Sequence, residues 1–238
     1  SLLILIRGEF ILLYIICLFL IFIENKNIKK IIITLLITLS ILSPYILRNY
    51  IVFNEIVITK STGFNLWRGN NIYANVNGST FTYDKYPDLK TDISNILIKL
   101  KKENQLNNFE VQLDNYFFKR AKNNIINDPT KYLNLYIKKF FAYMFVNIES
   151  DYPRYFNPLV ILPELIYSIV CVIGIFVNLF SKNINYKFLI ILTFYYFLIP
   201  SFFILPRYKL FILPLIIYFI GFLINKILSK KNFFKKTI

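Results

Sequence analysis

Long apolar blocks, separated by short connectors rich in Lys and Asn, constrain the fold of this chain most. Apolar side chains make up 56% of its 238 residues, and they fall into the runs 10–23, 31–47, 165–180, 188–205 and 210–228. A soluble protein of this length cannot bury so many uniformly apolar runs, whereas a bilayer solvates them and favours helices. The sequence therefore predicts an all-α membrane protein, a polytopic bundle of transmembrane helices.

The apolar runs divide the chain into three predicted segments. Residues 1–47 hold the first transmembrane helices, residues 48–156 form a long polar segment, and residues 157–238 hold three further helices and a basic tail. Basic residues at 26–30, at 182–187 and in the tail share one side of the membrane if all five runs span it. The positive-inside rule makes that side cytoplasmic, so we expect segment 48–156 to be extracytoplasmic.

Two helices are predicted within the extracytoplasmic segment. Apolar side chains at four-residue spacing predict one helix from about Asn108. Asp128 followed by Pro129 predicts the start of the other, because Asp caps a helix and Pro suits its first turn. Its apolar stripe, with lysines nearby, suits a helix on the membrane surface or one packed against the bundle. Residues 48–83 show no helical period and are interpreted as irregular.

The net charge of +15 does not point to a nucleic-acid partner. The lysines cluster at the ends of apolar blocks, where they anchor a chain at the membrane interface. Histidine is absent, which excludes histidine bases, Ser-His triads and most zinc sites. Cys17 and Cys171 both lie in apolar runs, where a thiol usually serves as a small packing group. These residues predict no metal site, and no cofactor is identifiable.

The chain begins at Ser1, inside an apolar run and without the charged start of a signal peptide. We expect this chain to be the C-terminal part of a longer protein.

Three stretches carry a family resemblance, and they occur in order along nearly the whole chain. The first is PYILRNY at 44–50 with GFNLWRGNN at 63–71, the second is DPTKYL at 128–133 with KKF at 138–140, and the third is PRYK at 206–209 with ILPL at 212–215. Together they resemble bacterial C-type (GT-C) glycosyltransferases related to the protein O-mannosyltransferases.

The resemblance implies an enzyme that moves a sugar from a polyprenyl phosphate to an acceptor outside the cytoplasmic membrane. Its partners would be the lipid-linked sugar and membrane lipids. In this family the catalytic acid, which serves as a base or as a ligand to a divalent metal, lies in the first outer loop. That loop would precede Ser1, so we expect this chain alone to be inactive.

A lipid phosphate at the outer interface requires cations at that depth beside apolar grooves. The residues expected to bind the substrate are Arg48, Arg68, Asn70, Arg207 and Tyr208.

Each of these features has an alternative interpretation. Arg48 ends a predicted span and could be a snorkelling anchor. Trp67 could be an interfacial anchor or could stack on a sugar. Asn70 could simply close a turn. The alternative function is a membrane transporter or a non-catalytic scaffold, but a transporter should carry polar groups in mid-span, where this chain is almost wholly apolar.

Overall fold

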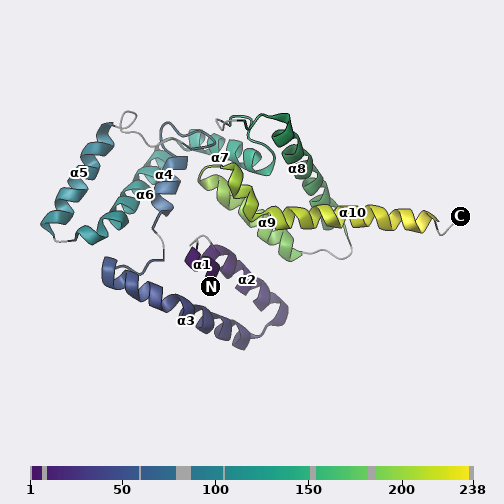
Figure 1. Ribbon diagram of the computed structural model, residues 1–238, viewed down its shortest axis with the longest axis horizontal. Helices are drawn as coiled ribbons and strands as arrows, with labels where there is room; N and C mark the ends of the chain where they lie inside the picture. Colours follow the sequence, from purple (N-terminus) through teal and green to yellow (C-terminus); the bar gives the residue numbers. More distant parts are fainter. Residues whose placement is uncertain are drawn as a thin grey trace. The chain divides into compact units, whose positions relative to one another are not determined.

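The computed structural model describes residues 2–6, 10–58, 60–78, 87–103, 105–150, 154–181 and 186–235. Every regular element within these ranges is helical (Figure 1), so the predicted all-α class is confirmed. The α-helices are α1 (Leu2–Ile6), α2 (Phe10–Asn25), α3 (Ile28–Phe53), α4 (Thr62–Gly69), α5 (Pro87–Lys102), α6 (Phe109–Asn127), α7 (Pro129–Met144), α8 (Pro158–Leu179), α9 (Tyr186–Leu198) and α10 (Leu213–Lys235). Short 3-10 turns lie at Leu106–Asn108, Ile199–Ser201 and Pro206–Phe211. Lys182, which belongs to the basic group at 182–187, lies outside the described ranges.

Two helices, α3 and α8, are long and apolar enough to cross a membrane. The apolar parts of α2, α9 and α10 are shorter. Cys17 on α2 is partly exposed and Cys171 on α8 is buried, and neither forms a disulfide.

The caps of α3 and α8 set where these two helices begin. Asn27 accepts hydrogen bonds from the backbone N–H groups of Lys29 and Lys30 at the start of α3. Asn157 caps α8, and Pro158 fills its first position. α8 begins at Pro158, before the predicted apolar run 165–180, so Glu164 lies beyond the first turn of the helix.

The chain divides into two compact units, each built from segments that are distant in the sequence. Unit 1 comprises Ser1–Trp67 and Thr80–Asn123, and unit 2 comprises Arg68–Ser79 and Asn124–Ile238.

An aromatic core organises unit 1. Trp67, Leu89, Phe117 and Ala121 form its buried cluster, and the ring centroids of Trp67 and Phe117 lie 4.7 Å apart. Trp67 is only 1% exposed, so its ring serves as a core group of this unit. The core joins α4, α5 and α6.

The N-terminus of α4 is capped from another helix. Asp114 on α6 accepts a hydrogen bond from the backbone N–H of Phe64 at 2.9 Å. A side chain at Gly63 would place its Cβ 2.0 Å from the carbonyl oxygen of Asp114, so only glycine allows this approach. The sequence predicts no helix here because its cap comes from a residue 50 positions away.

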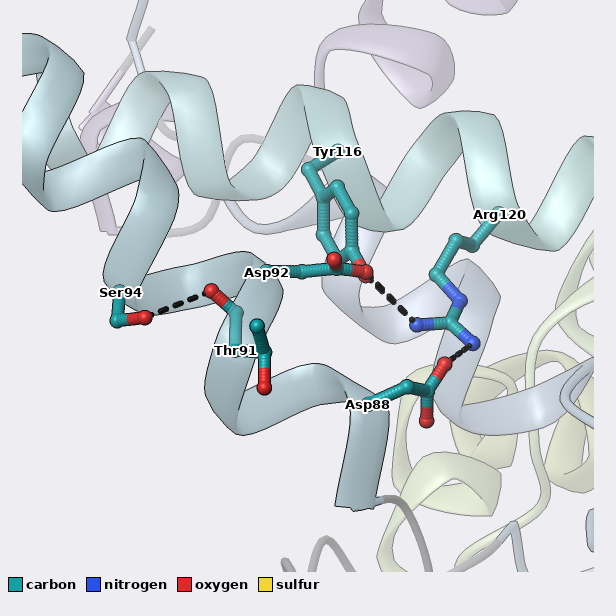
Figure 2. Close-up of polar contacts among 6 residues, drawn as sticks. All are labelled: Asp88, Thr91, Asp92, Ser94, Tyr116 and Arg120. Carbon is teal, nitrogen blue, oxygen red and sulfur yellow. Dashed lines mark hydrogen bonds and ion pairs between the residues drawn. The ribbon is translucent and has the colours of Figure 1, made fainter.

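Polar contacts join α5 to α6 in unit 1. Figure 2 shows Arg120 on α6 between Asp88 and Asp92 on α5. Arg120 also donates to the hydroxyl of Tyr116 at 2.6 Å, and that hydroxyl donates to Asp92 at 2.5 Å. Burial and the hydrogen bond with Asp92 raise the pKa of Tyr116 to about 12, so the phenol stays protonated and keeps donating.

Unit 2 contains α7 to α10. Asp128 caps α7 by accepting from the N–H of Lys131 at 3.0 Å, which confirms the predicted helix start. α8 packs against α10, and a Cβ at Gly174 would lie 2.3 Å from the carbonyl oxygen of Phe219. Small residues of this kind let two apolar helices approach closely.

Candidate functional site

Two segments distant in the sequence pack together in unit 2. Asn70 donates from Nδ2 to the carbonyl oxygen of Ser201, 131 residues away, at 2.8 Å. The N–H of Ile204 donates to the carbonyl of Val76, also at 2.8 Å. A Cβ at Gly69 would lie 2.0 Å from the carbonyl oxygen of Phe202. Segment 68–78, which follows α4, and segment 199–209, which connects α9 to α10, therefore form one continuous surface.

A buried lysine on α7 holds these two segments together. Lys139 is fully buried, and its Nζ donates to the carbonyl oxygens of Gly69 and Phe202, each at 2.6 Å. The side-chain oxygen of Asn70 lies 3.4 Å from the same nitrogen. An ammonium has three N–H donors, so three oxygens satisfy it. Burial nevertheless lowers the pKa of Lys139 to about 7, because a desolvated charge is disfavoured.

The ring of Phe203 lies close to a charged and an aromatic residue of these two segments. The guanidinium carbon of Arg68 lies 4.5 Å from its centroid, and the ring of Tyr208 lies 5.8 Å away. Arg207 is exposed, and its guanidinium lies 5.9 Å from the centroid of Tyr208. The Nε of Arg68 is buried without a hydrogen-bond partner among the described residues. We call Arg68, Phe203, Arg207 and Tyr208 the arginine–aromatic cluster.

This cluster has the chemistry of an anion site with apolar walls. Guanidinium groups bind phosphate or carboxylate through parallel N–H donors. The aromatic rings attract the guanidinium groups through their π faces.

An ion pair in unit 2 joins the connector between α9 and α10 to helix α8. Lys209 Nζ is 2.6 Å from Glu164 Oε1, and both side chains are largely buried. Lys209 also donates to the carbonyl oxygen of Phe145. Burial lowers the pKa of Lys209, while the charge of Glu164 and its hydrogen bond raise it. The pair thus fixes the connector 206–211 to α8.

Tyr155, Asn147 and Asn77 form a chain of hydrogen bonds that begins beside this ion pair. Tyr155 accepts from the N–H of Asn147 at 3.0 Å. Asn147 in turn donates from Nδ2 to the side-chain oxygen of Asn77 at 2.6 Å. Burial raises the pKa of Tyr155 to about 12, with a further contribution from Glu164. The phenol stays neutral at physiological pH, and Asn77 links this network to segment 68–78.

Four of the five residues expected to bind substrate lie in unit 2, on segments 68–78 and 199–209. Arg68, Arg207 and Tyr208 belong to the arginine–aromatic cluster, while Asn70 is buried and holds the two segments together. The backbone oxygen of Asn70 also accepts from Asn124 at 3.1 Å.

The fifth residue, Arg48, belongs to unit 1. Its Nη1 donates to the side-chain oxygen of Asn49 at 2.9 Å. It lines a cavity of about 290 Å³ together with Tyr45, Lys60 and Glu110. This cavity lies beside the C-terminal part of α3, a helix long and apolar enough to span a membrane.

The sequence-based predictions do not include the buried groups Lys139, Lys209 and Glu164. Lys139 follows Lys138 and looks like half of an exposed pair. Its spacing of four and seven residues from the buried Leu135 and Tyr132 places it on the core face of α7. That periodicity is the signal that identifies it.

Comparisons with protein-family models, with curated proteins and with solved structures gave no match. Within the described part of the chain, no group of three His, Cys, Asp or Glu side chains is placed to hold a metal ion.

Proposed function

We propose that this chain is the C-terminal part of an integral membrane glycosyltransferase. In this proposal the enzyme transfers a sugar from a polyprenyl phosphate to an extracytoplasmic acceptor, and its catalytic acid lies in an upstream part. The observation that carries the proposal is the meeting, in unit 2, of residues 68–71, which end the first stretch that resembles the GT-C family, with the second and third stretches. Helix α7 carries the second stretch, and it donates from Lys139 to Gly69 in the first and from Tyr143 to Tyr208 in the third.

The arginine–aromatic cluster supplies the chemistry that the proposal requires. A polyprenyl phosphate carries its charge at the membrane interface and its chain in the bilayer. Arg68 and Arg207 are suited to the phosphate, and Tyr208, whose ring lies near the buried ring of Phe203, provides the apolar side of the site. A divalent metal, if the reaction uses one, would be held by the upstream part.

The proposal includes a topology in a cytoplasmic (inner) membrane. Helices α2, α3, α8, α9 and α10 would span the bilayer, residues 48–156 would be extracytoplasmic, and the C-terminus would be cytoplasmic. The apolar lengths of α3 and α8 support two of these spans, and the positions of the lysine clusters support the orientation.

A sugar-transfer assay on the intact enzyme tests this function. We expect Arg207→Lys to lose most of its turnover with a lipid-linked donor while inserting normally, because lysine cannot make two parallel hydrogen bonds to phosphate. Arg48→Lys is the matched comparison and should lose less, since a snorkelling role accepts either cation. Full activity of Arg207→Lys would show that the residue is only an anchor.

The buried ion pair of Lys209 and Glu164 favours a second candidate, a membrane transporter. Glu164 lies in the apolar helix α8, and an ionisable residue of such a helix that pairs with another charge often marks an ion or substrate pathway. Under this alternative, Glu164→Gln should abolish solute uptake into vesicles. Under the glycosyltransferase proposal, it should affect only stability and the shape of the connector.

A further inference from the structure

Helix α7 presents three different faces. One side of the helix is buried in unit 2. At 3.6 residues per turn, this side carries Tyr132, Leu135, Lys139, Ala142 and Tyr143. This face fixes the rotation of α7 about its axis, and with it the direction of every other side chain on the helix.

The face turned away from this core is also apolar. Leu133, Ile137 and Phe141 follow one another at four-residue spacing and are 61%, 45% and 54% exposed. These three residues are called the outer stripe of α7. An amphipathic helix of a soluble protein would carry polar residues at these positions.

The outer stripe continues onto an apolar helix. Phe140 lies at its edge, and its ring centroid is 5.3 Å from that of Phe197 on α9. Phe197 is itself exposed, and its carbonyl oxygen accepts from the hydroxyl of Tyr136 at 2.8 Å. The apolar surface therefore runs without a break from α7 to α9, one of the apolar helices of the chain.

Basic and amide side chains border the outer stripe on its other side. Lys131, Asn134 and Lys138 are exposed along this edge, and α7 itself contains no acidic residue. Lys138 pairs with Glu149 at 2.8 Å and Lys131 donates to the carbonyl of Ile72 at 3.1 Å. An apolar stripe beside a row of lysines matches a helix that lies in a bilayer interface, with its cations near anionic headgroups.

We propose that α7 is an interfacial membrane helix whose outer stripe is covered by lipid. Leu133, Ile137 and Phe141 lie among the upper acyl chains, roughly 5–10 Å below the headgroups as is usual for such helices, while Lys131 and Lys138 stay at headgroup level. The continuity with α9 selects lipid as the occupant, because the proposed span of α9 places lipid around the exposed Phe197, and that lipid would extend over the outer stripe. This inference does not depend on glycosyl transfer.

Tryptophan fluorescence in vesicles of phosphatidylcholine and phosphatidylglycerol tests this placement. The sole native tryptophan is first replaced as Trp67→Phe, and single tryptophans are then introduced by Leu133→Trp, Ile137→Trp and Phe141→Trp. Lipids brominated near the headgroup should quench all three strongly, and lipids brominated near the chain end should quench them less. Asn134→Trp, on the polar edge, is the matched control and should be quenched weakly by both.

A second measurement covers the case in which Trp67→Phe unfolds unit 1. Ile137→Cys and Asn134→Cys carry a spin label in a background that keeps Trp67, with Cys17 and Cys171 replaced. The label at position 137 should collide mainly with dissolved oxygen, and the label at position 134 mainly with a polar nickel complex. The proposal would be overturned if the two spin labels were equally exposed to water, or if bromine did not quench fluorescence along the outer stripe. Either result would mean that protein or solvent covers this face.

Discussion

Lys139 shows at the residue scale how burial and hydrogen bonding oppose each other. Its ammonium has three oxygen acceptors, yet burial lowers its pKa from 10.5 to about 7. Between these two values the unfolded chain binds a proton that the folded protein has released. The free energy of unfolding should therefore rise with pH across this window and level off below about 7, where both states hold the proton.

The variant Lys139→Met tests this pH dependence. Thermal unfolding in detergent at neutral pH and at about pH 9 should show a stability gain in the native chain that the variant lacks. The variant should also be less stable, by about 1–3 kcal/mol, because buried carbonyl groups lose their donor. If both proteins respond equally to pH, Lys139 does not titrate in this range.

The pair of Glu164 and Lys209 predicts a strongly non-additive double-mutant cycle. Either Glu164→Met or Lys209→Met leaves a buried charge without its partner, and each should cost about 3–5 kcal/mol of unfolding free energy. The double variant replaces both charges by apolar groups and should cost far less than the sum. The measurement is chemical or thermal unfolding of all four proteins, and additive losses would mean that the pair is not coupled.

At the element scale, the contact of α8 with α10 depends on one glycine. Gly174→Ala would put a methyl group 2.3 Å from the carbonyl oxygen of Phe219, and such overpacking should cost about 1–3 kcal/mol. Gly221 on α10 provides the control, since a Cβ there meets no atom within 4 Å. Gly221→Ala should gain up to about 1 kcal/mol from helix propensity. Similar melting temperatures for the two variants would contradict this packing.

Helices whose signals are local could be predicted from the sequence, and helices that depend on distant contacts could not. Asp128 and Pro129 mark the start of α7 within adjacent residues, and the apolar spacing of α6 is equally local. α4 has only eight residues, and its cap comes from Asp114 on α6. Nothing in the sequence around Thr62 contains that information.

The same distinction applies to the candidate site. Arg207 is visible as a cation between two apolar runs, and Arg68 lies in a stretch that carries the family resemblance, so the sequence suggests both directly. The contact of Arg68 with Phe203 and the burial of Lys139 depend on two segments meeting across the fold. A charge that is buried by such a meeting looks, in the sequence, like any solvent-exposed lysine.

At the scale of the whole molecule, the lysine clusters predict the sidedness of the chain. Reporter fusions at Ile238 and at Asn77 should report opposite compartments, with Ile238 in the cytoplasm. An alkaline phosphatase fusion should be active at Asn77, and a green fluorescent protein fusion should be fluorescent at Ile238. Finding both fusion points in one compartment would exclude the proposed topology.

The proposed function requires that the arginine–aromatic cluster bind a lipid-linked phosphate. The most direct test is photolabelling of the membrane-embedded chain by a photoreactive polyprenyl phosphate, with unlabelled polyprenyl phosphate as the competitor. The native chain should be labelled in a competable way, and Arg68→Gln and Arg207→Gln should each weaken binding by about 10–100-fold, as expected for one lost charged hydrogen bond. Arg154→Gln, which changes an exposed arginine outside the cluster, should bind like the native chain. Unchanged competition in both cluster variants would contradict the account.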